Sequence, residues 1–319
     1  MLILVSGANG FIGHNLCTVL ARSDRRVIAA TRYKLPDIAP KIKNFQISAL
    51  SDNTNWQFCL QGCDVVVHLA ARVHVMRDDV VDPLAAFRLI NVEGTLNLAH
   101  QAADAGVRRF IYLSSIKVNG EKTLPGEPFT DEDMPAPLDP YAISKYEAEE
   151  GLKKLAWQTG MEVVIIRPPL VYGPGVKANF MNMMRWLYKG VPLPFALIDN
   201  HRSLVGIDNL LDLIVVCLDH PAAANETFLV SDGEDLSTTE LLQRMAQALG
   251  KPAHLMPIPL YLLEAGAALL GKRDIAQRLC GSLQVDISKA RTMLGWNPPI
   301  SVDEGLHRTA QGFLHGKNI

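Results

Sequence analysis

The sequence has few cysteines for its length, and none has the spacing of a metal site. Its 319 residues contain five, which are Cys17, Cys59, Cys63, Cys217 and Cys280. No two of them form a C-x-x-C pair, and a sparse, odd-numbered set does not make a disulfide framework. An H-x-x-x-H pair, a nucleophile elbow and paired carboxylates are missing as well. We therefore predict free thiols in a reducing compartment and no metal.

The chain also lacks a block of basic residues and a long apolar segment. Its net charge is −2, so no nucleic-acid partner is expected. The apolar start "MLILVSGANG" has no basic leader and is interrupted at Gly7, unlike a secretory signal. The later apolar run "LLDLIVVCL" contains Asp212 and is far too short to span a membrane. These absences predict a soluble, cytoplasmic protein and leave small anionic molecules as candidate ligands.

What the sequence does contain is a regular alternation of strand-like and helix-like segments over residues 1–172. Helix-like stretches such as 11–23 and 84–106 separate short segments that are apolar on both faces, as buried parallel strands are. The strand-like segments are 2–6, 26–31, 45–50, 64–70, 109–115 and 162–167. The alternation predicts an α/β fold with a Rossmann-type, doubly wound parallel sheet.

The pattern changes after residue 172. Proline and glycine cluster in "RPPLVYGPG" and "KGVPLPFAL", and helices become longer relative to strands. We predict a dinucleotide-binding domain over residues 1–172 and a smaller, mainly helical substrate domain over residues 173–319. The segment 203–231 is expected to return to the first sheet.

Glycines follow the first predicted strand in the pattern G-x-x-G-x-x-G. A tight turn from strand to helix needs glycine, and close approach to a pyrophosphate leaves no room for a Cβ atom. The next helix offers free N–H groups and the positive end of its dipole. We predict that a dinucleotide contacts Gly7, Asn9, Gly10, Phe11, Ile12 and Gly13. The alternative is a glycine turn without a ligand.

The end of the second predicted strand bears on the choice between NAD and NADP. An NAD enzyme usually has an acidic residue there for the ribose 2′-hydroxyl, whereas this strand ends in Thr31-Arg32. Because Arg32 could pair with a 2′-phosphate, the sequence favours NADP; the alternative is a solvated arginine. Small residues after the fourth strand let a cofactor lie across the sheet edge, and these are Leu69, Ala70 and Ala71. The preceding His68 lies in an apolar run and is interpreted as a packed residue.

A tyrosine and a lysine with i, i+4 spacing follow Pro140 and should share one helix face. Ser114 and Ser115 end the fifth predicted strand, at the edge where open α/β sheets bind ligands. Beside a nicotinamide, these groups form a carbonyl-reduction site. Tyr141 would protonate the carbonyl oxygen, Lys145 would lower the phenol pKa, and Ser115 would hydrogen-bond the developing alkoxide. The alternative is a capped helix with a surface Tyr–Lys pair.

Together these segments resemble the extended short-chain dehydrogenases/reductases of the nucleotide-sugar epimerase/dehydratase family. The resemblance covers nearly the whole chain and rests on "GANGFIG", "VVHLAA", "NVEGTLNL", "PYAISK", "RPPLVYGPG" and "LGWNPP". It implies that Tyr141, Lys145 and Ser115 are catalytic, that Lys145 also holds the nicotinamide ribose, and that Asn91 supports the site from beneath. It adds Pro168 to the cofactor contacts and implies a homodimer.

The same resemblance suggests where a UDP-sugar would bind. It assigns the diphosphate to Asn179, Arg202 and Arg278, and the base to Phe195, because the arginine fork donates to phosphate in pairs. Ser115 and Lys117 would face the sugar. The alternatives are surface arginines, a core phenylalanine, a helix-capping asparagine and a solvated lysine.

The combined interpretation is hydride transfer at carbon 4 of a UDP-linked hexose. Within the family, the sequence resembles the bacterial UDP-sugar 4-ketoreductases of surface-polysaccharide synthesis and the UDP-glucose 4-epimerase group. We favour reduction of a 4-keto-6-deoxy-N-acetylhexosamine with NADPH, because of Arg32 and because Lys117 replaces a threonine that many relatives carry. A 4-epimerase is the alternative, and a non-catalytic dinucleotide-binding scaffold is the second.

Overall fold

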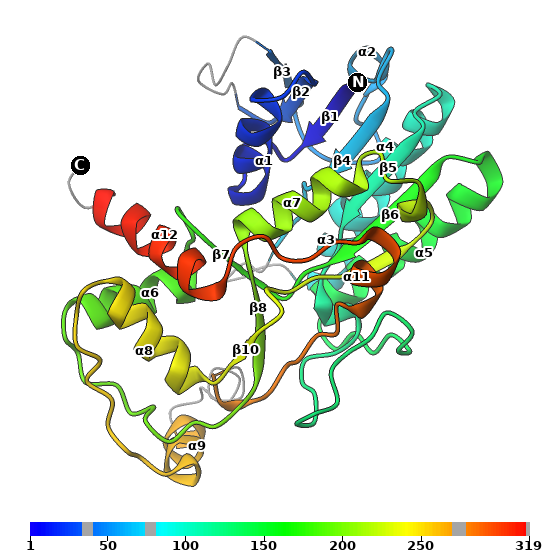
Figure 1. The fold of residues 1–319 in the computed structure, drawn as a ribbon. Helices are drawn as coiled ribbons and strands as arrows, with labels where there is room; N and C mark the ends of the chain where they lie inside the picture. The colour runs from blue at the N-terminus through cyan, green and yellow to red at the C-terminus, as the bar shows by residue number, and fades with distance from the viewer. Residues whose placement is uncertain (34–40, 74–80, 270–278, 317–319) are drawn as a thin grey trace.

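The computed structural model describes residues 1–33, 41–73, 81–269 and 279–316. A seven-stranded parallel sheet, in the order β3-β2-β1-β4-β5-β6-β9, forms its centre (Figure 1). The strands are β1 (Leu2–Ser6), β2 (Arg26–Thr31), β3 (Ile42–Gln46), β4 (Val65–His68), β5 (Arg109–Leu113), β6 (Glu162–Arg167) and β9 (Thr227–Leu229). The predicted doubly wound α/β fold is confirmed.

The strand order reverses beside β1, and this reversal places the candidate site. The chain moves outward from β1 to β2 and β3 on one side, then crosses to β4 and continues on the other. Ser6 at the end of β1 is in register with Ala30 of β2 and His68 of β4. The loops that follow these strands therefore start at one sheet edge, where such folds bind ligands.

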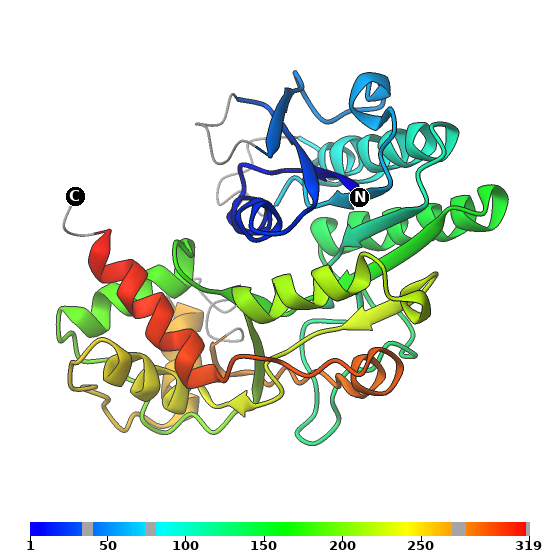
Figure 2. The same ribbon diagram turned by 45° about the horizontal axis from the view of Figure 1, so that its top comes forward.

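Helices cover both faces of the sheet (Figure 2). Alternate strand side chains point to opposite faces, so Ile3 and Val5 belong to one core cluster and Leu4 to another. The first face is covered by α1 (Phe11–Ala21), α7 (Ile207–Cys217) and α11 (Ser288–Leu294). The second is covered by α2 (Gln57–Leu60), α4 (Gly94–Asp104) and α5 (Pro140–Thr159).

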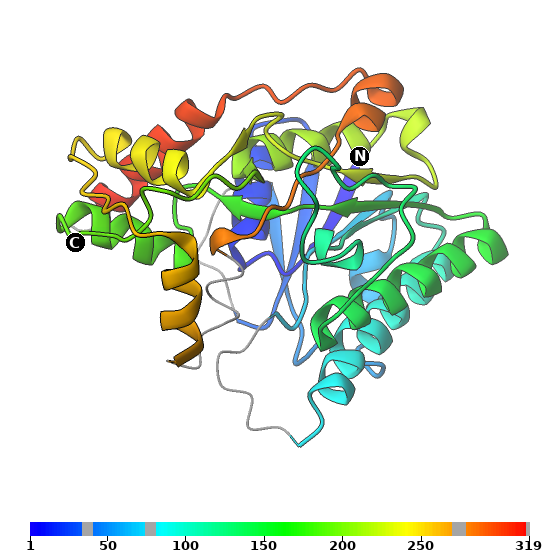
Figure 3. The same cartoon turned by 90° about the horizontal axis from the view of Figure 1, so that it is seen from below.

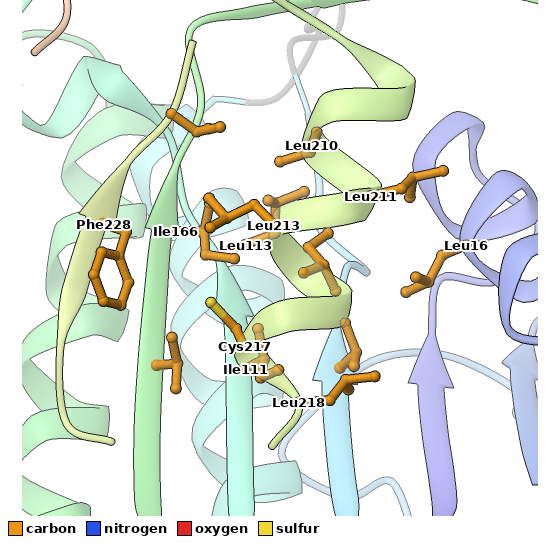
Figure 4. Packing of buried hydrophobic residues seen from close by; sticks show 14 of the residues in the cluster. Leu16, Ile111, Leu113, Ile166, Leu210, Leu211, Leu213, Cys217, Leu218 and Phe228 are labelled. Atoms are coloured by element: carbon orange, nitrogen blue, oxygen red, sulfur yellow. The ribbon is translucent and has the colours of Figure 1, made fainter. Parts of the chain in front are cut away.

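The α7 helix shows how the first face is packed. Leu213 and Cys217 point toward Ile111, Leu113 and Ile166 of the strands, whereas Leu211 points toward Leu16 of α1 (Figure 4). Each fully buried aliphatic side chain contributes roughly 1.5–3 kcal/mol relative to exposure. This packing ties the 207–217 segment to the sheet although it lies far along the chain.

The predicted helix 84–106 is interrupted. The structure has α3 (Pro83–Arg88), a π-helical segment (Leu89–Glu93) and then α4. The third strand, predicted at 45–50, instead occupies 42–46, where Ile42 pairs with Val27. A short 3₁₀ turn (Ile116–Val118) follows β5.

A second sheet and a group of helices lie below the large sheet (Figure 1). The strands β7 (Leu170–Tyr172), β8 (Arg202–Gly206) and β10 (Asp235–Leu236) pair in the order β10-β8-β7. Around them pack α6 (Ala178–Tyr188), α8 (Thr238–Ala248) and α12 (Val302–His315). A further helix, α9 (Leu260–Leu269), projects beyond this group (Figure 3).

The expectation that 203–231 returns to the large sheet needs a correction. β9 does so by pairing with β6, but β8 pairs with β7 and β10. The reason is that α7 crosses the first face between these two strands, so only the later one reaches the sheet. The domain boundary at residue 172 stays a prediction. No helix in the described ranges is both long and apolar enough to span a membrane.

Candidate active site and cofactor-binding site

The glycine loop after β1 has no room for side chains at two of its positions. Gly7 has φ +69°, and a Cβ atom there would lie 2.7 Å from the amide nitrogen of Ala70. A Cβ atom at Gly13 would lie 2.2 Å from the carbonyl oxygen of Gly7. Gly10 is the N-cap of α1, and its N–H donates to the Gly7 oxygen at 2.9 Å. Asn9 is exposed beside it.

This loop fits the pyrophosphate of a dinucleotide. It brings bare backbone to the sheet edge and presents the N-terminal end of α1, whose first residues Phe11 and Ile12 are partly buried. Two features support the fit. Cβ atoms at Gly7 and Gly13 would clash with the backbone, and the positive end of the α1 dipole favours a phosphate.

Ser6 and His68 hold the neighbouring loop against the glycines. The Ser6 hydroxyl accepts the N–H groups of Leu69 at 3.2 Å and Ala70 at 3.3 Å, and lies 2.6 Å from His68 Nδ1. His68 Nε2 lies 2.9 Å from the Thr95 hydroxyl. Burial, with the nearby Lys145 charge, lowers the pKa of His68 to about 3. His68 is thus a neutral core residue.

The remaining predicted cofactor contacts lie along the same edge. Arg32 directly follows β2 and is exposed, with its guanidinium 6.0 Å from the centre of the Tyr33 ring. Ala71 follows Ala70 and is partly buried. The carbonyl of Pro168, just after β6, accepts the N–H of Ile116 at 3.0 Å, which places it beside Ser115.

The three predicted catalytic residues come together at the end of β5. The Ser115 side chain is near enough to the Tyr141 phenol to lower its pKa. Lys145 is 3% exposed, and its Nζ donates to the Leu113 carbonyl at 2.8 Å. Its Nζ lies 4.5 Å from the centre of the Tyr112 ring and 6.0 Å from that of Tyr141. Strand β5 and helix α5 therefore position this group jointly.

Helix α5 begins where it does because of an aspartate and a proline. Asp139 is the N-cap, and its Oδ1 accepts the Ala142 N–H at 2.7 Å. Pro140 takes the first helical position, where no N–H is needed. Tyr141 is thereby fixed in the first turn. Its ring packs edge-to-face with the Phe87 ring, and the two ring centres are 6.1 Å apart.

Burial dominates the titration of the tyrosine and the lysine. The pKa of Tyr141 is raised to about 12, chiefly by burial and secondly by the Asp139 charge, whereas Ser115 lowers it. Burial lowers the pKa of Lys145 to about 7, against the effect of Glu149. The sequence-based expectation of a lowered phenol pKa therefore needs a correction, because desolvation disfavours both charged forms.

Asn91 supports the site from beneath. It is buried in the π-helical segment, where its Oδ1 accepts the Arg72 N–H at 2.7 Å. Its Nδ2 donates to the Arg72 carbonyl and to the Ser144 hydroxyl, each at 3.0 Å. The Ser144 hydroxyl in turn donates to the Tyr141 carbonyl at 2.8 Å. Asn91 thus braces the first turn of α5.

Sequence reasoning missed a buried ion pair behind the lysine. Glu149 lies one turn after Lys145 and is bound by the guanidinium of Arg167. The Nη1 atom of Arg167 also donates to Asn119 Oδ1 at 2.9 Å. The available signal was an arginine after four consecutive apolar residues in the strand 162–167, together with a glutamate four residues after Lys145.

The predicted substrate residues are spread along the second sheet and its helices. Asn179 is exposed in the first turn of α6. Phe195 packs partly buried against the helix cluster, and its carbonyl accepts the Thr239 hydroxyl at 2.6 Å. Arg202 begins β8, and its Nη1 donates to the Gly281 carbonyl at 2.9 Å. Arg278 lies outside the described residues.

The Lys117 ammonium has two carboxylate partners. It pairs with Asp139 and lies 3.0 Å from Glu121 Oε1. Contact with a sugar, as predicted, would have to compete with these ion pairs. No three metal-binding side chains cluster among the residues that the structure describes.

A Rossmann-type sheet with serine, tyrosine and lysine at its edge defines the class of short-chain dehydrogenases/reductases. Residues 3–231 match the model of the NAD dependent epimerase/dehydratase family, and the chain belongs to that family of enzymes. It is 51% identical over 318 residues to a UDP-glucose 4-epimerase of Vibrio cholerae, which covers 99% of this chain and 96% of the relative.

More distant relatives extend the comparison. The chain is 29% identical over 336 residues to the N-acetyl-alpha-D-glucosaminyl-diphospho-ditrans,octacis-undecaprenol 4-epimerase of Escherichia coli O157:H7, covering 99% of this chain and 96% of that protein. The crystal structure of UDP-glucuronic acid 4-epimerase from Bacillus cereus in complex with NAD has a TM-score of 0.79 at 23% identity, over 98% and 96% of the two chains. The crystal structure of UDP-glucose 4-epimerase from Thermotoga maritima with UDP-glucose has a TM-score of 0.77 at 24% identity. The match covers 99% of this chain and 100% of that one. The two structures share this fold.

Proposed function

We propose that this protein is an NAD-dependent 4-epimerase that interconverts UDP-glucose and UDP-galactose. The observation that carries the proposal is the meeting of Ser115, Tyr141 and Lys145 at the edge of a dinucleotide-binding sheet. The identity of 51% to a UDP-glucose 4-epimerase over nearly the whole chain supports the choice of reaction and substrate.

The reductase that the sequence favoured is not confirmed. One of its two supports was Lys117, whose ammonium is engaged by Asp139 and Glu121. The other was Arg32, which is exposed and lies against Tyr33. Neither arrangement favours reduction over epimerisation, whereas the comparisons favour the epimerase.

The residues of the site have distinct roles in this reaction. The glycine loop around Gly7 and Gly13 would hold NAD, which would supply reversible hydride exchange with carbon 4 of the sugar. Tyr141 takes the proton from the 4-hydroxyl and gives it back, and Ser115 hydrogen-bonds the phenol while this happens. The Lys145 ammonium, 6.0 Å from the ring centre, favours the phenolate that must form.

The substrate end remains part of the proposal. Arg202 at the start of β8 and Asn179 at the start of α6 would hold the diphosphate, and Phe195 would contact the base. Because Arg202 would contact the diphosphate and not the reacting carbon, we expect Arg202→Met to raise KM for UDP-glucose more than it lowers kcat. Family membership also supports a homodimer and a cytoplasmic location, which stay predictions.

We also propose NAD, rather than NADP, as the cofactor. The crystal structure of the UDP-glucuronic acid 4-epimerase from Bacillus cereus contains NAD, which supports this choice. The test is to denature the purified protein and assay the released dinucleotide with one NAD-specific and one NADP-specific dehydrogenase. Release of NADP alone would restore the prediction from Arg32.

The reaction itself is tested without added cofactor. The purified protein is incubated with UDP-glucose, and the anomeric proton signals of both UDP-hexoses are followed by NMR. Epimerisation to equilibrium is expected. A protein that leaves UDP-glucose unchanged but oxidises NADPH stoichiometrically with UDP-4-keto-6-deoxy-N-acetylglucosamine would be a reductase instead.

A further inference from the structure

Lys117 links the two segments that meet at the catalytic phenol. It lies in the 3₁₀ turn after β5, and its N–H donates to the Ser115 hydroxyl at 3.3 Å. Its ammonium crosses to Asp139, which caps α5. One side chain thus joins the turn that carries Ser115 to the helix that carries Tyr141.

Asp139 uses its two oxygens differently. Oδ1 accepts the Ala142 N–H at 2.7 Å, while Oδ2 pairs with the Lys117 ammonium. The side chains of Lys117 and Asp139 are 28% and 27% exposed, so solvent screens this pair only in part. The capping carboxylate lies only two residues before Tyr141.

We propose that Lys117 is a positioning residue of the proposed epimerase, which fixes the first turn of α5 against Ser115 and neutralises the carboxylate beside the Tyr141 phenol. The inference rests on the proposed function for its kinetic test but not for its electrostatic one. Because the Asp139 charge raises the pKa of Tyr141, removing the lysine should raise that pKa further.

Other charged and titratable groups lie around the phenol in the part of the chain that the structure describes. Lys145 lies on the same helix and faces both Tyr112 and Tyr141. Two carboxylates have partners: Glu121 pairs with Lys117, and Glu149 pairs with Arg167. The Arg72 guanidinium lies over the Phe87 ring. His68 is kept neutral by burial. Of the carboxylates in the described ranges, Asp139 raises the Tyr141 pKa.

The test is a double-mutant cycle. Lys117→Met removes the ammonium but keeps an unbranched apolar chain, and Asp139→Asn removes the charge but keeps an acceptor for the Ala142 N–H. In Lys117→Met, the rising limb of kcat against pH should move to higher pH. At neutral pH, kcat of Lys117→Met should be roughly 3- to 10-fold lower than that of wild type. A rise of about one unit in the phenol pKa lowers the phenolate population about tenfold. Asp139→Asn should move the limb to lower pH, and the double variant should return close to wild type.

A second readout does not need turnover. The fraction of Tyr141 phenolate is measured by ultraviolet difference spectroscopy against a Tyr141→Phe background, at one alkaline pH at which all variants stay folded. It should fall in Lys117→Met and recover in the double variant. Lys153→Met is the matched control, because Lys153 pairs with Glu150 on the exposed face of α5. It should move neither readout.

The outcomes separate the two proposals. A raised KM for UDP-glucose in Lys117→Met that Asp139→Asn does not rescue would overturn the inference and make Lys117 a sugar contact. An unchanged phenolate fraction in folded Lys117→Met would overturn it as well, even in an active epimerase. A lowered phenolate fraction in a protein without epimerase activity would keep the electrostatic role and reject the proposed function.

Discussion

Glu149 and Arg167 form a bidentate ion pair inside the protein. Glu149 Oε1 lies 3.0 Å from Arg167 Nε, and Oε2 lies 2.5 Å from Nη2. The two side chains are 0% and 2% exposed. Because the Glu149 carboxylate also raises the pKa of Lys145, the ion pair connects Lys145 to the end of β6.

Breaking this pair should be costly. Glu149→Gln leaves the Arg167 guanidinium without its counter-charge in the core, and such losses destabilise proteins by about 3–5 kcal/mol. The free energy of unfolding in urea measures the effect. Glu150→Gln is the control, because Glu150 pairs with Lys153 at the surface and such pairs contribute little. Equal unfolding free energies for the two variants would contradict the assignment.

The role of Tyr141 is tested by removing one oxygen. Tyr141→Phe keeps the ring against Phe87 but has no phenol to exchange the proton, so kcat should fall by about 10²- to 10⁴-fold. Bound dinucleotide per chain, measured after denaturation, should stay at the wild-type level. Tyr146→Phe on the next turn of α5 should leave kcat unchanged. Wild-type turnover in Tyr141→Phe would favour a different acid or the non-catalytic scaffold.

The glycine loop gives a prediction that concerns both binding and stability. In Gly13→Ala the new methyl carbon would lie 2.2 Å from the Gly7 oxygen, so the loop must shift. We expect loss of bound dinucleotide and a lower melting temperature. Gly266→Ala in α9 meets nothing within 4 Å and should retain the dinucleotide. There the gain of helix propensity is up to about 1 kcal/mol. Full dinucleotide occupancy in Gly13→Ala would contradict the proposal that the glycine loop binds the pyrophosphate.

His68 should make the protein sensitive to acid. Its pKa is about 3 in the folded protein against an ordinary 6.5, so below pH 6.5 the unfolded chain binds a proton that the native protein does not. Stability then falls as pH falls, by up to about 1.4 kcal/mol per pH unit. Unfolding free energies measured from pH 6.5 downward should fall less steeply for His68→Asn than for wild type. Parallel curves would mean that His68 titrates normally.

The sequence predicted well those features that local patterns determine. The strands 2–6, 26–31 and 162–167 were found at those positions, because continuous apolar runs specify a central strand that is covered on both faces. The placement of Tyr141 followed from helix periodicity and from Pro140.

Features set by distant contacts could not be predicted in this way. The π-helical turn at Leu89–Glu93 carries Asn91 to the backbone of Arg72, a partner that helix periodicity does not reveal. The ion pair of Lys117 with Asp139 joins residues 22 positions apart, so no local spacing rule reveals it. The pKa values of Tyr141 and Lys145 depend on burial, which a spacing rule does not measure.

The pairing of β6 with β9 has a consequence for how the protein emerges from the ribosome. When residue 172 has been synthesised, β6 is still an open sheet edge and the face that α7 will cover is bare, because both partners come later in the chain. Nascent chains at this stage expose a strand edge of the kind that invites aggregation. Completion of the dinucleotide-binding sheet therefore has to wait for translation of the second half, and folding cannot simply proceed one half at a time.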